Sequence, residues 1–341
     1  MAKPEKWLDK EFEEKVYSYF HTRVPDKVFD AHAHITKRDF KDVAPEEMLK
    51  KEIEGYECLL GKGKYKGGVM MGNPNLFETQ EAYDDERLFS CECYKGYDGF
   101  FVTGLLVRPW DGEEDVIKWL NIYPTIGALK VYWVYGKDIN CETDILEFAP
   151  EWVWKIADDR KMAVILHLSH DSEGLAHPKN IEQLRFISKK YPNAKIQLAH
   201  CGMGHNPYMF KKGLDQILDI ENLYIDLSGI AEPLTYIYTF KHFDRKKLFF
   251  AIDGYGFAIN NLGKCFGIGK GFMGLHSGEN IPAVAPRGVI DLPYRFGGIT
   301  PAAENMLALF AAGDLAELHE SEWEDIFYNN AVNFYSEIIR K

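Results

Sequence analysis

Apolar and polar residues follow two different patterns along this chain. Short, near-continuous apolar runs, typical of buried strands, are separated by longer segments whose apolar residues recur three and four positions apart, as in amphipathic helices. The pattern predicts eight strands, at residues 28–35, 67–71, 100–107, 126–132, 163–168, 195–199, 223–227 and 248–252.

The predicted helices lie between these strands. They cover residues 5–20, 45–60, 79–94, 113–120, 143–160, 178–191, 207–220 and 233–243, and a closing helix begins at Pro301. Continuous apolar strands are expected in a parallel sheet that helices cover on both faces. Eight such units without a change in composition predict an α/β fold, a single (β/α)8 TIM barrel over residues 1–341. An open doubly wound sheet is the alternative; it is weakened because no Gly-x-Gly-x-x-Gly turn follows the first strand.

Residues 260–300 interrupt this rhythm. The stretch is rich in glycine and proline and has weak periodicity, which predicts a long irregular loop after the eighth strand. Its aromatic residues, such as Phe266 and Phe296, argue against disorder. An active-site lid is the functional interpretation, and a contact between subunits is the alternative.

Composition and charge narrow the class of protein. The chain has 341 residues, of which 46% are hydrophobic and 27% charged, as in an ordinary globular protein. Its net charge of -12 disfavours nucleic acid and anionic membrane as partners. The first residues lack the apolar core of a signal peptide, and six cysteines in a chain of this length do not suggest a disulfide framework. We therefore expect a cytoplasmic homo-oligomer with reduced thiols that acts on a small molecule.

Candidate metal ligands stand at the ends of the predicted strands. His32 and His34 are two residues apart on the first strand, so both imidazoles point to one face and can reach the same ion. Later strands supply further polar side chains near their carboxyl ends: Lys130, His167, His200 and Asp253. Each alone could be a core histidine, an ion pair or a helix cap. Enzymes with a (β/α)8 barrel carry their active site at the carboxyl ends of the strands. The presence of all these side chains at that end therefore predicts a functional site.

The order of these residues resembles the amidohydrolase superfamily and, within it, the amidohydrolase-2 branch, which includes lactonases and aminocarboxymuconate-semialdehyde-type decarboxylases. Residues 191–202, 222–229 and 329–335 also resemble segments of that branch, so the resemblance spans roughly residues 28–339. The sequence departs from the branch after the eighth strand. It has Ala-Ile-Asp-Gly-Tyr at residues 251–255, where Gly-Ser/Thr-Asp-x-Pro is common.

The resemblance implies a metal centre. His32, His34, His167 and Asp253 would hold one Zn²⁺ or another divalent transition metal, with water at an open position. Asp253 would also act as general acid–base, and His200 would orient the water or stabilise the oxyanion. In two-metal relatives the residue at His200 binds a second ion and a carboxylated lysine, here Lys130, bridges the pair. We favour one ion, with Lys130 as a substrate contact.

The substrate-binding candidates are Arg108, Lys130, Trp133, Tyr135, His170 and Arg295. Arg108 could clamp a carboxylate or form an ion pair on the barrel rim. Trp133 and Tyr135 could line a pocket or pack beneath a loop. Arg108 and Arg295 together favour an acidic substrate.

These residues indicate a metal-dependent hydrolase of an amide, lactone or related carbonyl compound, with a small carboxylated molecule as its expected substrate. A non-oxidative decarboxylase on the same metal site is the alternative. A barrel without catalytic activity is a third reading, which the intact ligand set disfavours.

Overall fold

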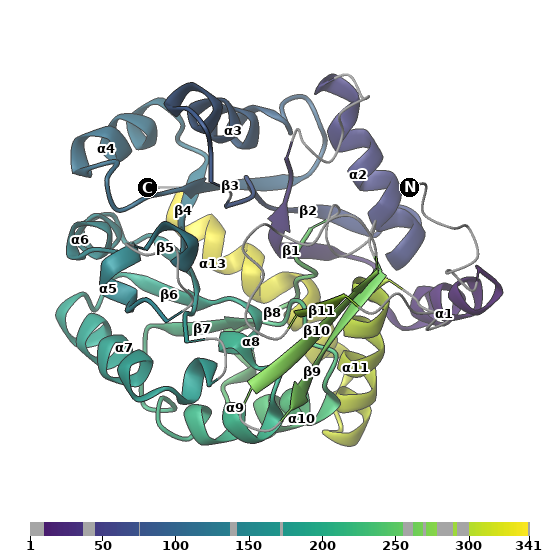
Figure 1. The fold of residues 1–341 in the computed structure, drawn as a ribbon. Helices are drawn as coiled ribbons and strands as arrows, with labels where there is room; N and C mark the ends of the chain where they lie inside the picture. The colour runs from purple at the N-terminus through teal and green to yellow at the C-terminus, as the bar shows by residue number, and fades with distance from the viewer. Residues whose placement is uncertain are drawn as a thin grey trace.

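The computed structural model describes residues 10–36, 45–74, 76–136, 142–170, 173–254, 262–268, 271–277, 289–291 and 300–339. Eight parallel strands form one sheet in chain order (Figure 1). They are β1 (Val28–His34), β2 (Tyr65–Met71), β3 (Phe100–Leu106), β4 (Ile126–Tyr132), β5 (Ala163–His167), β6 (Lys195–Leu198), β7 (Leu223–Asp226) and β8 (Leu248–Phe249). The Ala31 amide donates a hydrogen bond of 3.0 Å to the Phe250 carbonyl and brings the last strand back to the first. This architecture confirms the predicted (β/α)8 barrel.

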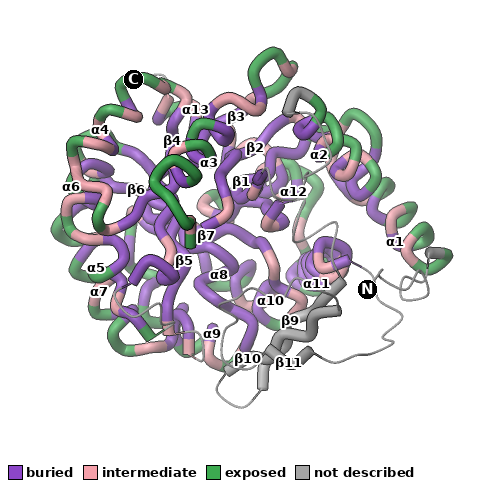
Figure 2. The backbone as a smooth tube through the Cα atoms, turned by 45° about the horizontal axis from the view of Figure 1, so that its top comes forward, coloured by how far each residue is buried: buried purple, intermediate pink, exposed green. Residues whose placement is uncertain are grey.

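Helices surround the strands, as Figure 1 shows. The longer ones are α1 (Lys10–Arg23), α2 (Pro45–Leu60), α3 (Gln80–Glu92), α4 (Glu113–Ile122), α6 (Glu151–Arg160), α7 (Pro178–Lys190), α9 (Pro207–Leu214), α10 (Pro233–His242), α11 (Pro301–Leu315) and α13 (Asn330–Ile339). Between them lie the short helices α5 (Ile145–Phe148), α8 (His200–Met203) and α12 (Glu320–Glu324). Figure 2 shows the strands buried at the centre and the exposed positions on the outer helix faces.

Helix α13 covers the amino-terminal ends of the strands. The Tyr335 ring lies 6.1 Å from the Phe29 ring at the start of β1, and its hydroxyl donates a 2.5 Å hydrogen bond to Gln197 of β6. Because this end is filled, the open end of the barrel is the one where the strands finish. Apolar side chains of β4 and β5, such as Val131 and Ile165, are fully buried, as expected of strands covered on both faces.

The structure differs from the sequence-based prediction in two helices. The single helix predicted for residues 143–160 is two helices, because Pro150 precedes α6 and disfavours helical geometry at Ala149. The helix predicted for residues 207–220 ends at Leu214 and continues as turns. No helix in the described part of the chain is long and apolar enough to span a membrane.

The stretch predicted to be irregular contains three strands where the structure describes it. Strand β9 (Leu262–Ile268) pairs antiparallel with β10 (Gly271–Ser277), and β10 pairs in parallel with β11 (Val289–Asp291). The hydrogen bonds of this ladder join backbone groups, which every residue including glycine carries. Strands can therefore pair here although the sequence shows no clear hydrophobic alternation. Strand β9 lies near α11 (Figure 1). The lid role of this segment stays a prediction.

Candidate metal centre

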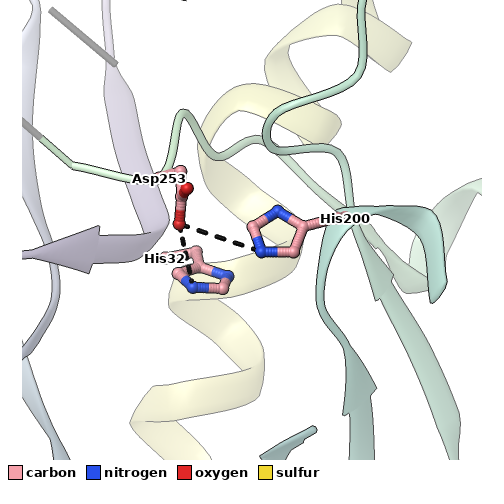
Figure 3. A group of neighbouring side chains, drawn as sticks. All are labelled: His32, His200 and Asp253. Carbon is pink, nitrogen blue, oxygen red and sulfur yellow. Dashed lines mark ion pairs between the residues drawn. The ribbon is translucent and has the colours of Figure 1, made fainter. Parts of the chain in front are cut away.

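Three of the predicted residues meet at the carboxyl ends of the strands. His32 from β1, His200 after β6 and Asp253 after β8 have ligand atoms that all lie within 4.8 Å of one another, and they form the one such group among the described residues. Figure 3 shows the Asp253 carboxylate facing both imidazoles. Its Oδ1 atom lies 3.3 Å from His32 Nε2 and 3.9 Å from His200 Nε2.

His34 lies beside this group, as its position on β1 predicts. Its Nε2 atom is 3.1 Å from His32 Nε2 and 3.7 Å from Asp253 Oδ1. The alternation of β1 therefore directs both imidazoles to one point. His34 and Asp253 keep some exposure while His32 is fully buried, so the centre is reached from the His34 and Asp253 side.

The partners of the β1 histidines fix their tautomers. His32 Nδ1 lies 2.9 Å from Asp226 Oδ2, and His34 Nδ1 lies 2.9 Å from the Gly72 carbonyl oxygen. A carboxylate and a carbonyl only accept hydrogen bonds, so both Nδ1 atoms carry the proton. Each Nε2 atom therefore presents a lone pair to the centre, as a metal ligand must.

The same tautomer follows for His200 through a serine. The Ser228 hydroxyl donates its one hydrogen to Asp226 Oδ1 at 2.6 Å. Its oxygen must then accept the hydrogen bond from His200 Nδ1, which is 2.9 Å away. His167 Nδ1 donates to the Leu168 carbonyl oxygen at 3.1 Å, so its Nε2 is unprotonated too. All four predicted histidine ligands share one tautomer.

This donor set fits a divalent metal ion. The Nε2 lone pairs of His32 and His34 face each other across 3.1 Å, an unfavourable arrangement that a metal ion, or the Lys130 ammonium 3.1 Å from His32 Nε2, would relieve. Burial lowers the pKa of both imidazoles well below the usual value, so they are neutral and able to bind a metal. Imidazole nitrogens with one carboxylate oxygen are the ligands that Zn²⁺ and similar ions take.

Lys130 reaches the same point from β4. Its Nζ atom lies 3.1 Å from His32 Nε2, and the side chain is fully buried. Burial lowers the pKa of Lys130 to about 8 and raises that of Asp253 to about 8. Asp253 also has a φ of 74°, a conformation that costs a non-glycine residue free energy and is concentrated at functional sites.

His200 is presented by a left-handed turn. Helix α8 has positive φ at all four of its residues, with 53° at His200 and 51° at Cys201. Such backbone costs about 1–2 kcal/mol per non-glycine residue. The turn is held by Asp226, whose Oδ1 accepts from the His200 amide at 3.0 Å.

Asp226 is a functional residue that the sequence reasoning did not assign. It ends β7, is fully buried and accepts hydrogen bonds from both the His32 ring and the His200 backbone. Gln197 Nε2 donates to it as well, at 3.0 Å. The signal was present, because Asp226 is a polar residue at the end of a strand, in a segment that resembles the branch.

His167 lies next to His200 rather than in the tightest group. It ends β5, is buried, and its ring centroid is 5.0 Å from that of His200 and 4.1 Å from that of Tyr132. Its unprotonated Nε2 keeps it available as a ligand. Its place in the first coordination sphere remains a prediction.

The predicted substrate residues lie at the same end of the barrel, with their own partners. Arg108 donates from Nε and Nη2 to Asp111 Oδ1, at 2.9 and 2.8 Å, and lies 3.5 Å over the Tyr83 ring. This geometry matches the rim ion pair, and the carboxylate clamp stays a prediction. His170 contacts Asp144 at 3.3 Å and stacks on His177.

Trp133 and Tyr135 form a turn directly after β4. Both are buried, and Trp133 Nε1 and the Tyr135 hydroxyl have no hydrogen-bond partner among the described residues. Two buried donors without acceptors are compatible with polar contacts to a ligand, while the burial matches the packing alternative. Arg295 lies outside the described residues.

The fold and the site define an eight-stranded barrel with a cluster of candidate metal ligands at the carboxyl ends of its strands. No family model and no curated protein matches the sequence. Solved structures share the fold along nearly the whole chain. One is 4-oxalomesaconate hydratase from Rhodopseudomonas palustris, with a TM-score of 0.56 and 14% identity over 91% of this chain and 96% of that one.

Two further structures with this fold contain a metal. An amidohydrolase from Burkholderia multivorans with bound zinc has a TM-score of 0.54 and 10% identity, over 91% of this chain and 99% of that one. A dihydroxybenzoic acid decarboxylase from a Polaromonas species with bound manganese has a TM-score of 0.53 and 12% identity, over 92% of this chain and 97% of that one. At these identities the likeness shows a shared fold, and the proteins that share it are described with more than one type of reaction.

Proposed function

We propose that the chain is a metal-dependent hydrolase of a small carboxylated amide, lactone or related carbonyl compound. The observation that carries this proposal is the convergence of Nε2 lone pairs from His32, His34 and His200 on one oxygen of Asp253. These residues, with His167 beside them, would hold one divalent ion, zinc or another transition metal. When bound, such an ion polarises a carbonyl group and acidifies water.

The residues of the chain would move and hold the protons of the reaction. Asp253 directs Oδ1 to the imidazoles, so its Oδ2 atom can accept a proton from the attacking water and pass it to the leaving group. The Lys130 ammonium would contact an anionic or carbonyl oxygen of the substrate.

Decarboxylation on the same site is the second candidate. It requires a proton donor beside the carbon that loses CO₂, and the centre holds the buried Lys130, whose pKa of about 8 lets it keep a proton at neutral pH. A structure with the same fold is described as a dihydroxybenzoic acid decarboxylase. Both reactions would use the same ligand set.

A substrate panel separates the two reactions. The metal-loaded protein is incubated with lactones and amides, for which acid release is measured, and with carboxylated aromatic compounds, for which CO₂ release is measured. Acid release that is lost in Asp253→Asn supports the hydrolase. CO₂ release that depends on the same residue supports the decarboxylase and overturns the hydrolase. A metal-loaded protein that is inactive on both panels would contradict both.

A further inference from the structure

A second buried carboxylate lies under the metal centre and is not one of its ligands. Asp30 is on β1, two residues before His32, and is fully buried. It accepts three hydrogen bonds. The Tyr56 hydroxyl donates to Oδ2 at 2.6 Å, the His32 amide donates to Oδ1 at 2.8 Å, and the Ile252 amide donates to Oδ2 at 3.3 Å.

Two of these donors belong to the segments that carry metal ligands. The His32 amide is the backbone of a ligand, and Ile252 directly precedes Asp253. The pairing of β8 with β7 ends at Phe249, so Asp253 stands on a segment outside the sheet ladder. The Asp30 carboxylate thus links β1 to the segment after β8. Its hydrogen bonds go to the backbone of His32 itself and to the residue directly before Asp253.

Tyr56 orients that carboxylate from helix α2. Its hydroxyl has one hydrogen, which it donates to Asp30 Oδ2, the same oxygen that accepts from Ile252. The Tyr56 ring is fully buried and stacked on the Tyr65 ring, with centroids 4.1 Å apart and planes 8° apart. This stack fixes the hydroxyl in place.

We propose that Tyr56 and Asp30 are positioning residues that set the separation of His32 and Asp253, and with it the affinity and the coordination geometry of the metal centre. This inference rests on the proposed function, because it requires that His32 and Asp253 bind a metal ion. Neither Tyr56 nor Asp30 belongs to the group of candidate ligands.

The test compares two tyrosines of the same stack. Tyr56→Phe removes the hydroxyl that donates to Asp30. Tyr65→Phe removes a hydroxyl whose one hydrogen bond among the described residues is to the Met70 sulfur, at 4.0 Å.

Co²⁺ is the probe for both variants. Its dissociation constant is measured by competition with a chelator, and its visible absorption reports the coordination geometry. Partners that orient metal ligands typically contribute 10–100-fold to affinity, so we expect Tyr56→Phe to weaken Co²⁺ binding about tenfold and to change the spectrum. We expect Tyr65→Phe to change neither.

A second variant checks that the two residues act as a unit. In Asp30→Ala the acceptor of the Tyr56 hydroxyl is gone, so Tyr56→Phe should weaken Co²⁺ binding no further in that background. Equal Co²⁺ affinities and spectra for Tyr56→Phe and Tyr65→Phe would overturn the inference. A lower melting temperature of metal-free Tyr56→Phe would not rescue it, because that result shows only a structural role. Wild-type protein that binds no Co²⁺ would instead overturn the metal centre itself, so the two failures are distinguishable.

Discussion

At the scale of single residues, Asp226 determines how two imidazoles present their nitrogens. Its Oδ2 accepts from His32 Nδ1, and its Oδ1 accepts from Ser228, which in turn accepts from His200 Nδ1. One buried carboxylate therefore sets the tautomer of a ligand directly and of another through a hydroxyl. Loss of such a partner typically lowers metal affinity by about 10–100-fold.

Asp226→Asn should weaken metal binding by at least about tenfold, because in either orientation the amide nitrogen faces hydrogen-bond donors. His32 would then shift its proton to Nε2 and lose the lone pair that binds the ion. Isothermal titration with Zn²⁺ measures the effect. Asp219→Asn is the matched control, because Asp219 is exposed and pairs with Arg185 far along the surface. Equal affinities in the two variants would contradict this role of Asp226.

The sequence identified the side chains that meet at the candidate site better than the residues that support them. The spacing of His32 and His34 on a strand suffices to place both imidazoles on one face, and the structure brings them together. Asp30 and Asp226 were not assigned because the sequence does not show whether an aspartate on a strand faces solvent or a histidine ring. Only the fold shows that both are buried and which groups donate to them.

At the scale of elements, the segment after β8 is held by a close approach to β1. Gly254 has a φ of 85°, and a Cβ atom there would lie 2.5 Å from the His34 amide nitrogen and 2.9 Å from its Cα. A residue with a side chain at 254 would displace either Asp253 or His34.

Gly254→Ala should therefore abolish tight metal binding and lower the free energy of unfolding by more than the strain of a positive φ alone. Gly112→Ala is the matched control, since Gly112 has a φ of 84° and no atom within 4 Å of an added Cβ. We expect the control to cost about 1 kcal/mol and to keep its metal. Urea unfolding of the two metal-free variants and Zn²⁺ titration measure both effects. Equal unfolding free energies would show that the contact with His34 is unimportant.

Elements with a clear hydrophobic pattern were predicted well, and the exceptions have local causes. The eight strands and their order follow from apolar runs that become the buried barrel wall. The break at Pro150 depends on a single residue inside an otherwise helical pattern. Strands β9 to β11 were missed because their stretch has weak alternation, and their pairing is a property of the backbone.

At the scale of the whole molecule, buried histidines make the metal-free fold sensitive to acid. Burial lowers the pKa of His205 to about 4, whereas an unfolded histidine titrates near about 6.5. Burial also lowers, well below the usual value, the pKa of the candidate ligands His32, His34, His167 and His200. Below about pH 6.5 the unfolded chain binds protons that the folded chain does not, so stability falls with falling pH.

We predict that the unfolding free energy of the metal-free protein decreases between about pH 6.5 and 4, with each such histidine contributing up to about 1.4 kcal/mol per pH unit. His205→Gln should make this dependence shallower by about one proton. The control is His242→Gln, the same substitution at an exposed position. Denaturant unfolding at a series of pH values measures the slopes, and equal slopes in the two variants would refute the contribution of His205.

The metal centre is the claim on which the account depends, and metal content tests it most directly. Elemental analysis is applied to the purified, reconstituted protein and to the His32→Ala/His34→Ala double variant. We predict close to one equivalent of a divalent transition metal in the wild-type protein and none in the variant. Close to two equivalents would instead support a second ion at His200 with a carboxylated Lys130 between the two. A wild-type protein that holds no metal after reconstitution, or a variant that holds as much as the wild type, would contradict the account.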